Sequence, residues 1–296
     1  MSDSRHKVGV IGLGAMGAPM ARNLARAGRL AGVWNRTAGK AAALAAELGV
    51  RQADAPDDLA RHCEVILTCV SADADLLAVV DQALPGLDGD KLLIDTSTVQ
   101  PATAVEVARR LAEAGCGFLD APVSGGVEGA RQGTLAIMVG GDAHTLERAR
   151  PVLEAIGRQI THMGPVGSGQ ATKAVNQIMA AGINQAVSEA LAFAEAEGLP
   201  LDKVIEVVAS GAAGNWFLER RGPAMVRGEF PPGFRLALHH KDLAICRAIA
   251  ERHGVSLPVV EMTLIHYRRL MEAGFGDEDI SALFREKRRL FGMEEN

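Results

Sequence analysis

Short apolar runs alternate with helical patterns along the first half of the chain. Residues 7–11 form the first run, which is rich in valine and isoleucine, and a helical pattern follows over residues 18–27. A short β-branched run predicts a buried strand, whereas apolar residues that recur every three to four positions predict a helix. This alternation predicts a parallel sheet covered by helices on both faces. Further strands are expected at residues 30–34, 64–70, 91–95, 117–120, 133–141 and 159–162, and further helices at 38–48, from 101 onward and at 151–156.

Strand patterns fade after residue 164, and helical patterns replace them. The longest one is rich in alanine, covers residues 170–197 and stops at Gly198. At ~1.5 Å per residue it would be roughly 40 Å long, so we expect it to bridge two domains or to form a dimer core. The sequence therefore predicts a Rossmann-type doubly wound domain over residues 1–164 and an all-helical domain over residues 165–296. Shorter helices are expected at residues 202–210, 217–227, 239–253, 258–273 and 279–291.

A glycine-rich segment lies between the first strand and the first helix. It has the spacing G-x-G-x-x-G in the context that a dinucleotide-binding turn requires. The glycines permit a tight turn, close approach of a pyrophosphate and close packing of helix on strand. The helix start adds N–H donors for the phosphates. The alternative is a turn that serves packing alone. The residues expected to contact the cofactor here are Gly12, Leu13, Gly14, Ala15, Met16 and Gly17.

The end of the second strand bears on the choice of cofactor. An acidic residue there accepts a hydrogen bond from the ribose 2′-hydroxyl of NAD, whereas an arginine suits the 2′-phosphate of NADP. This chain has Asn35, Arg36 and Thr37, with no carboxylate. Guanidinium, hydroxyl and amide groups can all bind a phosphate. We therefore favour NADP; the alternative is that Arg36 faces solvent and that NAD is used as well.

Polar residues follow other predicted strands. Val70 and Ser71 end the third strand, and Thr98 follows the fourth, at the edge where ligands of such sheets bind. Thr98 has an alternative role as the cap of the helix after Pro101. Further on, Ser124, Gly125 and Gly126 form a loop whose backbone N–H groups and hydroxyl suit a small carboxylate.

The long helix carries a lysine in its first turns. Lys173, Asn176 and Gln177 are spaced so that they share one helix face. Most lone lysines are solvated, but neighbours such as Val175 and Met179 are typical of a buried helix. A buried lysine must be paired or must have a lowered pKa, because burial disfavours its charged form. That state suits a lysine that transfers protons.

Other charged segments have simpler interpretations. Adjacent His239 and His240 cannot share a helix face, so we interpret them as structural residues and predict no metal site. The pair Lys241-Asp242 is either an internal ion pair or contains a second functional lysine. Residues 278–279 and 285–289 are expected to be solvated.

Composition narrows the class of protein. The chain has 296 residues, a formal net charge of -5 and 48% hydrophobic residues, enough for two domains with large cores. The absence of a basic block argues against a nucleic-acid partner. No apolar run has the length of a membrane span or the pattern of a signal peptide. The four cysteines are far apart and are expected to be free thiols. We expect a soluble, cytoplasmic protein.

Several motifs in the same order make the chain similar to the β-hydroxyacid dehydrogenase family. Its members include 3-hydroxyisobutyrate dehydrogenases, tartronate semialdehyde reductases and glyoxylate/succinic semialdehyde reductases. The resemblance covers essentially the whole chain. The motifs that carry it are residues 12–24, residues 120–126, residues 133–135, Gly169 with Lys173 and Asn176, and residues 241–243.

The resemblance implies a role for each matching position. Lys173 would be the catalytic acid/base, and Asn176 would orient the substrate. Where 3-hydroxyisobutyrate dehydrogenases tend to have two asparagines, this chain has Asn176-Gln177, which is more like the semialdehyde reductases. The implied enzyme reduces a small carboxylate-bearing aldehyde. The long helix adds the expectation of a homodimer or homotetramer formed through the helical domain. Ser124, Gly125 and Gly126 would hold the substrate carboxylate, and Thr98 and Lys241 would lie at the nicotinamide end of the cofactor.

The sequence has four alternative functional interpretations. One is a 3-hydroxyisobutyrate or serine dehydrogenase that uses NAD. A 6-phosphogluconate dehydrogenase is disfavoured because it has a longer helical domain and a histidine where this chain has Val175. An imine reductase usually replaces the lysine that is retained here as Lys173. A non-catalytic NADP-binding module would also be expected to lose this lysine.

Overall fold

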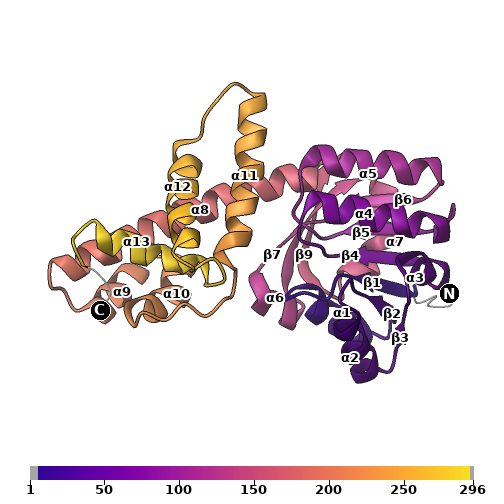
Figure 1. The fold of residues 1–296 in the computed structure, drawn as a ribbon, viewed down its shortest axis with the longest axis horizontal. Helices are drawn as coiled ribbons and strands as arrows, with labels where there is room; N and C mark the ends of the chain where they lie inside the picture. The colour runs from indigo at the N-terminus through magenta and orange to yellow at the C-terminus, as the bar shows by residue number, and fades with distance from the viewer. Residues whose placement is uncertain (1–5, 294–296) are drawn as a thin grey trace. The chain divides into compact units, whose positions relative to one another are not determined.

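The computed structural model of the protein describes residues 6–293. The chain divides into two compact units, the first ending at Lys173 and the second beginning at Ala174. The first unit is an α/β structure and the second is helical, which confirms the predicted fold class (Figure 1).

The first unit is built on one sheet, which has nine strands in the described residues. Their order is β3-β2-β1-β4-β5-β6-β8-β7, and β9 pairs with β8. Strands β1 to β6 pair with one another in parallel. The strands are β1 (Val8–Ile11), β2 (Leu30–Trp34), β3 (Arg51–Gln52), β4 (Val65–Thr68), β5 (Leu92–Asp95), β6 (Gly117–Asp120), β7 (Val123–Ser124), β8 (Leu135–Gly141) and β9 (Gly157–Gly164).

One part of this sheet differs from the parallel arrangement that the alternating pattern predicts. Strand β8 is antiparallel to both β6 and β7. The connection from Ser124 to Leu135 is shorter than the dozen or so residues that a parallel crossover needs. The chain therefore turns back beside itself, and the sheet is mixed at this end.

Helices cover both faces of the sheet, because successive strand residues point to opposite sides. In β5, Leu92 and Ile94 belong to one apolar core and Leu93 to another. The first core joins the sheet to α1, α2, α6 and α7, and the second joins it to α3, α4 and α5 (Figure 1). These helices are α1 (Gly17–Arg26), α2 (Ala38–Leu48), α3 (Pro56–His62), α4 (Asp73–Ala83), α5 (Pro101–Glu113), α6 (Gly126–Gln132) and α7 (Ala143–Leu153).

Helix α7 corrects a predicted element. The sequence pattern placed a helix at residues 151–156, whereas the observed helix begins at Ala143 and contains Pro151. Its start is set by Asp142, whose side chain accepts a hydrogen bond from the Thr145 N–H at 2.9 Å. A capping aspartate outweighs a proline that lies in the last turns.

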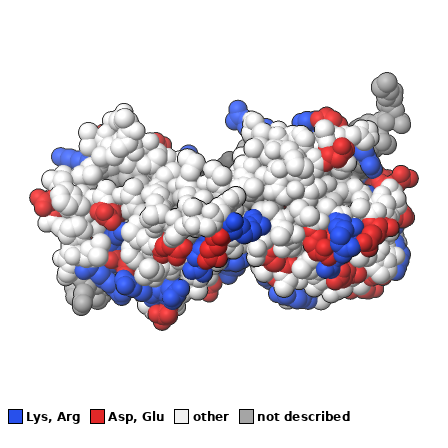
Figure 2. All heavy atoms as spheres, turned by 90° about the horizontal axis from the view of Figure 1, so that it is seen from above, with Lys and Arg blue, Asp and Glu red and all other residues white. Residues whose placement is uncertain are grey.

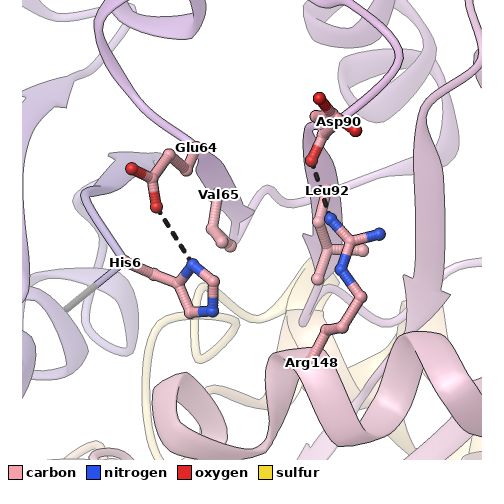
Figure 3. A pocket seen from close by; sticks show the side chains of 6 residues that line it. All are labelled: His6, Glu64, Val65, Asp90, Leu92 and Arg148. Atoms are coloured by element: carbon pink, nitrogen blue, oxygen red, sulfur yellow. Dashed lines mark hydrogen bonds and ion pairs between the residues drawn. The ribbon is translucent and has the colours of Figure 1, made fainter. Parts of the chain in front are cut away.

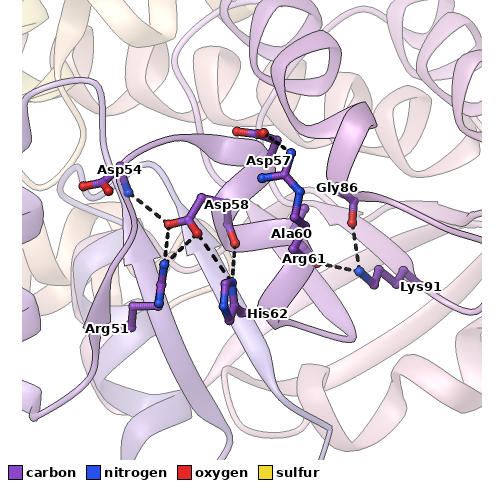
Figure 4. Close-up of polar contacts among 9 residues, drawn as sticks. All are labelled: Arg51, Asp54, Asp57, Asp58, Ala60, Arg61, His62, Gly86 and Lys91. Atoms are coloured by element: carbon purple, nitrogen blue, oxygen red, sulfur yellow. Dashed lines mark hydrogen bonds and ion pairs between the residues drawn. The ribbon is translucent and has the colours of Figure 1, made fainter.

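Polar side chains complete the ends of α3 (Figure 4). Lys91 Nζ donates to the carbonyl oxygens of Ala60 and Gly86, each at 2.8 Å. These carbonyls belong to α3 and to the 3-10 helix η1 (Leu84–Gly86). On the other side, Arg51 Nη2 contacts both carboxylate oxygens of Asp58 at 2.6 and 2.8 Å. Lys91 therefore has a structural role just before β5.

Helix α8 (Ser168–Ala196) continues into the second unit, which the remaining helices complete. Their apolar faces enclose one core that includes Phe217, Leu243, Leu264 and Tyr267. No helix within residues 6–293 combines the length and apolar composition needed to cross a bilayer. The other elements are α9 (Leu201–Ala209), α10 (Trp216–Val226), α11 (Leu236–Arg252), α12 (Pro258–Glu272), the 3-10 helix η2 (Ile280–Ala282) and α13 (Leu283–Arg289).

Two segments expected to be solvated are partly buried. Lys287 is only 1% exposed, and its Nζ lies 2.6 Å from Glu189 Oε2 on α8. Buried Asp279 accepts backbone hydrogen bonds from Gly233 and Phe234 at 3.0 and 2.9 Å. The prediction was wrong because the partners of these charges lie far away in the sequence. On the face shown in Figure 2, side chains of both signs are interspersed.

Candidate active site

The glycine-rich turn follows β1 and leads into α1. Gly12 has φ +93°, and a Cβ there would lie 2.2 Å from the Cys69 carbonyl oxygen. A Cβ on Gly17 would lie 1.8 Å from the Gly12 oxygen, so both glycines are required by the fold. A Cβ on Gly14 would meet nothing within 4 Å. The turn therefore leaves open space beside a helix start, which fits the pyrophosphate of a dinucleotide.

Asn35 ties the end of β2 to this turn. Its Oδ1 accepts from the Leu13 N–H at 2.9 Å, and its Nδ2 donates to the Thr37 carbonyl at 3.1 Å. The side chain thus holds the turn and the predicted ribose-binding segment together.

Arg36 has an acidic neighbour that comes from a different segment of the chain. Its Nη1 lies 2.7 Å from Asp75 Oδ1 in the first turn of α4. The Arg36 side chain is 83% exposed, so the ion pair is weak and easily exchanged for another anion. A carboxylate is therefore present beside the predicted phosphate-binding arginine, supplied by a distant segment.

The loops after β4 and β5 are bonded to each other. The Val70 N–H, next to Ser71, donates to Ser97 Oγ at 2.8 Å. Helix α5 starts at Pro101 with Gln100 as its N-cap residue, so the alternative that Thr98 caps this helix is wrong.

Gln170, in the first turn of α8, holds the loop that carries Thr98. Its Nε2 donates to the Ser97 carbonyl at 2.8 Å, and its Oε1 accepts from the Val99 N–H at 3.2 Å. Gln170 is buried. Its role was not predicted, because a glutamine at a helix start has no distinctive pattern.

Lys173 is 7% exposed, as its predicted buried state requires. Its Nζ donates to the Val123 carbonyl oxygen at 2.9 Å. Val123 directly precedes Ser124, Gly125 and Gly126, and the two glycines have φ of +133° and +62°. The structure thus brings the predicted acid/base next to the predicted carboxylate-binding loop.

The flanks of Lys173 differ from the sequence prediction. Val175 and Met179, expected to be buried, are 57% and 62% exposed. Helix α8 buries its polar residues Gln170, Lys173 and Gln177 instead. Local hydrophobicity marked the wrong face because the buried polar groups find hydrogen-bond partners.

In the second unit, further predicted residues form a chain of contacts. Asn176 Nδ2 donates to Gln177 Oε1 at 2.8 Å, and Gln177 Nε2 donates to Asp242 Oδ2 at 2.6 Å. Asp242 Oδ1 lies 2.9 Å from Lys241 Nζ, so the internal ion pair weighed for these residues is present.

His239, two residues before Lys241, has polar partners on other segments of the second unit. His239 is buried, and its ring nitrogens lie 3.0 Å from Tyr267 Oη and 3.3 Å from the Gln177 carbonyl. In the described part of the chain, no group of three His, Cys, Asp or Glu side chains is placed to hold a metal ion.

A separate pocket of about 320 Å³ lies at the amino-terminal ends of β4 and β5 (Figure 3). Val65 and Leu92, the first residues of β4 and β5, line it together with His6, Asp90 and Arg148. Cofactors of this fold bind at the carboxyl ends of the strands. The pocket is therefore at the wrong end of the sheet to be the cofactor site.

Comparison with known proteins agrees with this geometry. Residues 7–164 match the family described as the NAD binding domain of 6-phosphogluconate dehydrogenase. Residues 167–286 match the family described as NAD-binding of NADP-dependent 3-hydroxyisobutyrate dehydrogenase. Together these matches cover both units.

Individual relatives align over nearly the full chain. 2-Hydroxy-3-oxopropionate reductase of Escherichia coli is 39% identical over 85% of this chain and 87% of its own. NAD-dependent L-serine dehydrogenase of Pseudomonas aeruginosa is 35% identical over 94% and 96%. The structure of Mycobacterium tuberculosis 3-hydroxyisobutyrate dehydrogenase with L-serine has a TM-score of 0.86 and 33% identity, covering 96% of this chain and 99% of that one.

Proposed function

The chain belongs to the β-hydroxyacid dehydrogenase family of NAD(P)-dependent oxidoreductases acting on CH–OH groups, and from this premise we propose that it reduces a small carboxylate-bearing aldehyde with NADPH. Lys173 is the proposed acid/base of the reversible reaction. The observation that carries the proposal is the 2.9 Å hydrogen bond from Lys173 Nζ to Val123, the residue before Ser124.

The proposed chemistry uses the Lys173 side chain as a proton donor. When bound, the nicotinamide supplies a hydride to the carbonyl carbon or accepts one in the reverse direction. An ammonium group has three donors, so Lys173 can keep its bond to Val123 and still donate to the substrate oxygen. In the oxidation direction the neutral amine accepts the hydroxyl proton.

The carboxylate of the substrate is proposed to bind at Ser124, Gly125 and Gly126. The positive φ angles of Gly125 and Gly126 turn the backbone as an anion-binding loop requires. Such positioning supplies part of the roughly 7–11 kcal/mol by which good orientation can lower a reaction barrier. Asn176, three residues after Lys173 on α8, is proposed to orient the substrate, and Lys241 is proposed to lie at the nicotinamide end.

NADP is the proposed cofactor, held by residues 12–17, by the segment Asn35-Arg36-Thr37, and by Val70, Ser71 and Thr98. The exposed Arg36 guanidinium can exchange Asp75 for a 2′-phosphate. Tartronate semialdehyde, glyoxylate and succinic semialdehyde are the proposed substrates. Support comes from Gln177 and from the relative named 2-hydroxy-3-oxopropionate reductase.

A second candidate is oxidation of serine or 3-hydroxyisobutyrate with NAD. It is favoured by Asp75, whose carboxylate offsets the charge of Arg36 beside the ribose segment. The relative named NAD-dependent L-serine dehydrogenase also supports it.

We further propose that the protein forms a homodimer or homotetramer through its second unit. Helix α8 exposes Val175, Met179 and Phe193 on one side, and α12 exposes Met262 and Ile265. The two helices are neighbours, since Gln185 Nε2 donates to Thr263 Oγ1 at 3.0 Å. Exposed apolar side chains on neighbouring helices are typical of a protein interface.

The test is turnover of the purified protein on a panel of substrates. NADPH and NADH consumption would be measured with glyoxylate and with succinic, tartronate and methylmalonate semialdehydes; NADP⁺ and NAD⁺ reduction would be measured with serine and 3-hydroxyisobutyrate. We expect turnover on one or two aldehydes, faster with NADPH, and a loss of this preference in Arg36→Ala.

Lys173→Ala should bind cofactor as the wild type does but lose at least about a hundredfold in kcat, because general acid–base catalysis contributes roughly 10²–10⁴-fold. Near-normal turnover in this variant would refute the role of Lys173. Faster reaction of serine with NAD⁺ would establish the second candidate instead.

A further inference from the structure

Asp120 ends β6 and is fully buried. Its Oδ1 accepts from the Gly167 N–H at 2.8 Å, and its Oδ2 accepts from the Gln170 N–H at 2.9 Å. Both donors belong to the start of α8, which begins at Ser168. The first N–H groups of a helix have no partner within the helix, and the positive end of its dipole favours a carboxylate there.

Two glycines enclose the same carboxylate. A Cβ on Gly169 would lie 2.8 Å from Asp120 Oδ2 and 2.4 Å from the Met138 carbonyl oxygen. A Cβ on Gly140, in β8, would lie 2.4 Å from Asp120 Oδ1. The start of α8 is thus packed directly on β6 and β8 around the Asp120 carboxylate.

Lys173 follows Gln170 by three residues, which is less than one helical turn. The position of its Nζ beside Val123 therefore depends on where the first turn of α8 is held. We propose that Asp120 is a positioning residue for catalysis, which fixes the first turn of α8 so that Lys173 reaches the substrate-binding loop. This inference rests on the proposed role of Lys173.

The electrostatics of the Asp120 carboxylate support a role in catalysis in addition to packing. Burial raises the pKa of Asp120 to about 6, the two backbone hydrogen bonds oppose this shift, and nearby Asp95 adds to it. Asp95 of β5 is an ionisable neighbour that acts on Asp120, and β8 and α8 bring Gly140, Gly169 and backbone N–H groups against its carboxylate. An ionised Asp120 at neutral pH is costly, and costly carboxylates of this kind concentrate at functional sites.

The experiment compares Asp120→Asn with a matched control. The amide keeps the size of the carboxylate but turns an NH₂ group toward one of the two N–H donors, so the first turn of α8 must shift. The control is Asp142→Asn, at the N-terminus of α7, where Asp142 accepts from Thr145 at 2.9 Å but no proposed catalytic residue follows. The readouts are kcat, KM for the aldehyde and the Kd of NADPH.

We expect Asp120→Asn to lower kcat about a hundredfold, since a displacement of about 1 Å of a catalytic group costs that much. KM and the NADPH Kd should stay within about threefold, and Asp142→Asn should leave all three unchanged. If the role of Asp120 were purely structural, Asp120→Asn would lower the free energy of unfolding but leave kcat of the folded fraction intact. That result would overturn the inference.

A second measurement uses the wild type, so that the inference remains testable if Asp120→Asn does not fold. Protonation of Asp120 removes an acceptor from the same hydrogen bonds. We expect kcat to fall reversibly as the pH is lowered through about 6, by about tenfold at pH 5. A kcat that is flat between pH 7 and pH 5 would overturn the inference. Failure of the proposed function is distinguishable, because then the wild type has no aldehyde turnover or Lys173→Ala keeps it.

Discussion

Single buried polar side chains connect the functional loops of the first unit. Gln170 bonds to the loop that carries Thr98, and Asp120 bonds to the start of α8. Lys173 in turn bonds to Val123. Buried polar groups are expensive unless they are paired, so each of these bonds restricts the geometry around it. These bonds therefore tie the start of α8 to β6, to β7 and to the loop after β5.

The raised pKa of Asp120 predicts a specific pH dependence of stability. The folded pKa is about 6, above the value of about 3.9 in an unfolded chain, so between these values only the folded state binds the proton. This group therefore stabilises the fold at low pH, and its contribution to the free energy of unfolding is lost as pH rises toward 6. The total change is about 3 kcal/mol.

Urea unfolding of the wild type and of Asp120→Asn between pH 4 and pH 7 measures this effect. The free energy of unfolding of the wild type minus that of the variant should increase on acidification by up to about 3 kcal/mol. A difference that is constant over this range would show that Asp120 titrates alike in the folded and unfolded states.

At the scale of elements, α8 has two kinds of surface. Its first turn is packed against β6 and β8 at contact distance, with Gly169 at the closest point. Farther along, Gly182 lies where an added Cβ would be 3.8 Å from Val259 Cγ1. The same residue type on one helix is therefore required at one position and unnecessary at another.

Substitution of these glycines should have opposite effects. Gly169→Ala places a Cβ 2.4 Å from the Met138 carbonyl oxygen, and we expect a loss of about 3 kcal/mol or more in the free energy of unfolding. Gly182→Ala is the matched control and should gain about 0.5–1 kcal/mol, because alanine favours the helix. Equal effects in urea unfolding would contradict the packing described for the first turn.

At the scale of the whole molecule, the proposed assembly rests on exposed apolar side chains. Those on α8 and α12 belong to neighbouring helices of the second unit. The first unit also exposes an apolar residue on a helix, Val105 on α5. The second unit therefore offers the more extended apolar surface for association.

Sedimentation velocity tests this assignment. We expect the wild type to sediment as a dimer or tetramer and Ile265→Asp to dissociate, because a charge placed in a desolvated interface has no partner. Val105→Asp is the control and should keep the wild-type mass. A monomeric wild type, or dissociation by Val105→Asp alone, would contradict assembly through the second unit.

Local patterns in the sequence predicted much of this protein. The turn at residues 12–17 and the long helix, predicted at residues 170–197 and observed at Ser168–Ala196, depend on neighbours within a few positions, such as β-branched runs, glycines and helical spacing. Such interactions are written in consecutive residues. Local patterns also predicted that Lys173 is buried and that the chain has an α/β unit followed by a helical one.

Only the tertiary structure decided features that depend on distant partners. Asp75 lies beside Arg36, and Glu189 pairs with Lys287 across a long stretch of sequence. Nothing near Arg36 or Lys287 in the chain marks these partners. The exposed face of α8 and the antiparallel direction of β8 were likewise mispredicted, because burial and strand direction follow from how the elements pack. The sequence therefore determined the two-part fold class, the main parallel strands and the long helix, because these follow from local patterns. The fold determined which charges and hydrogen bonds surround the candidate residues.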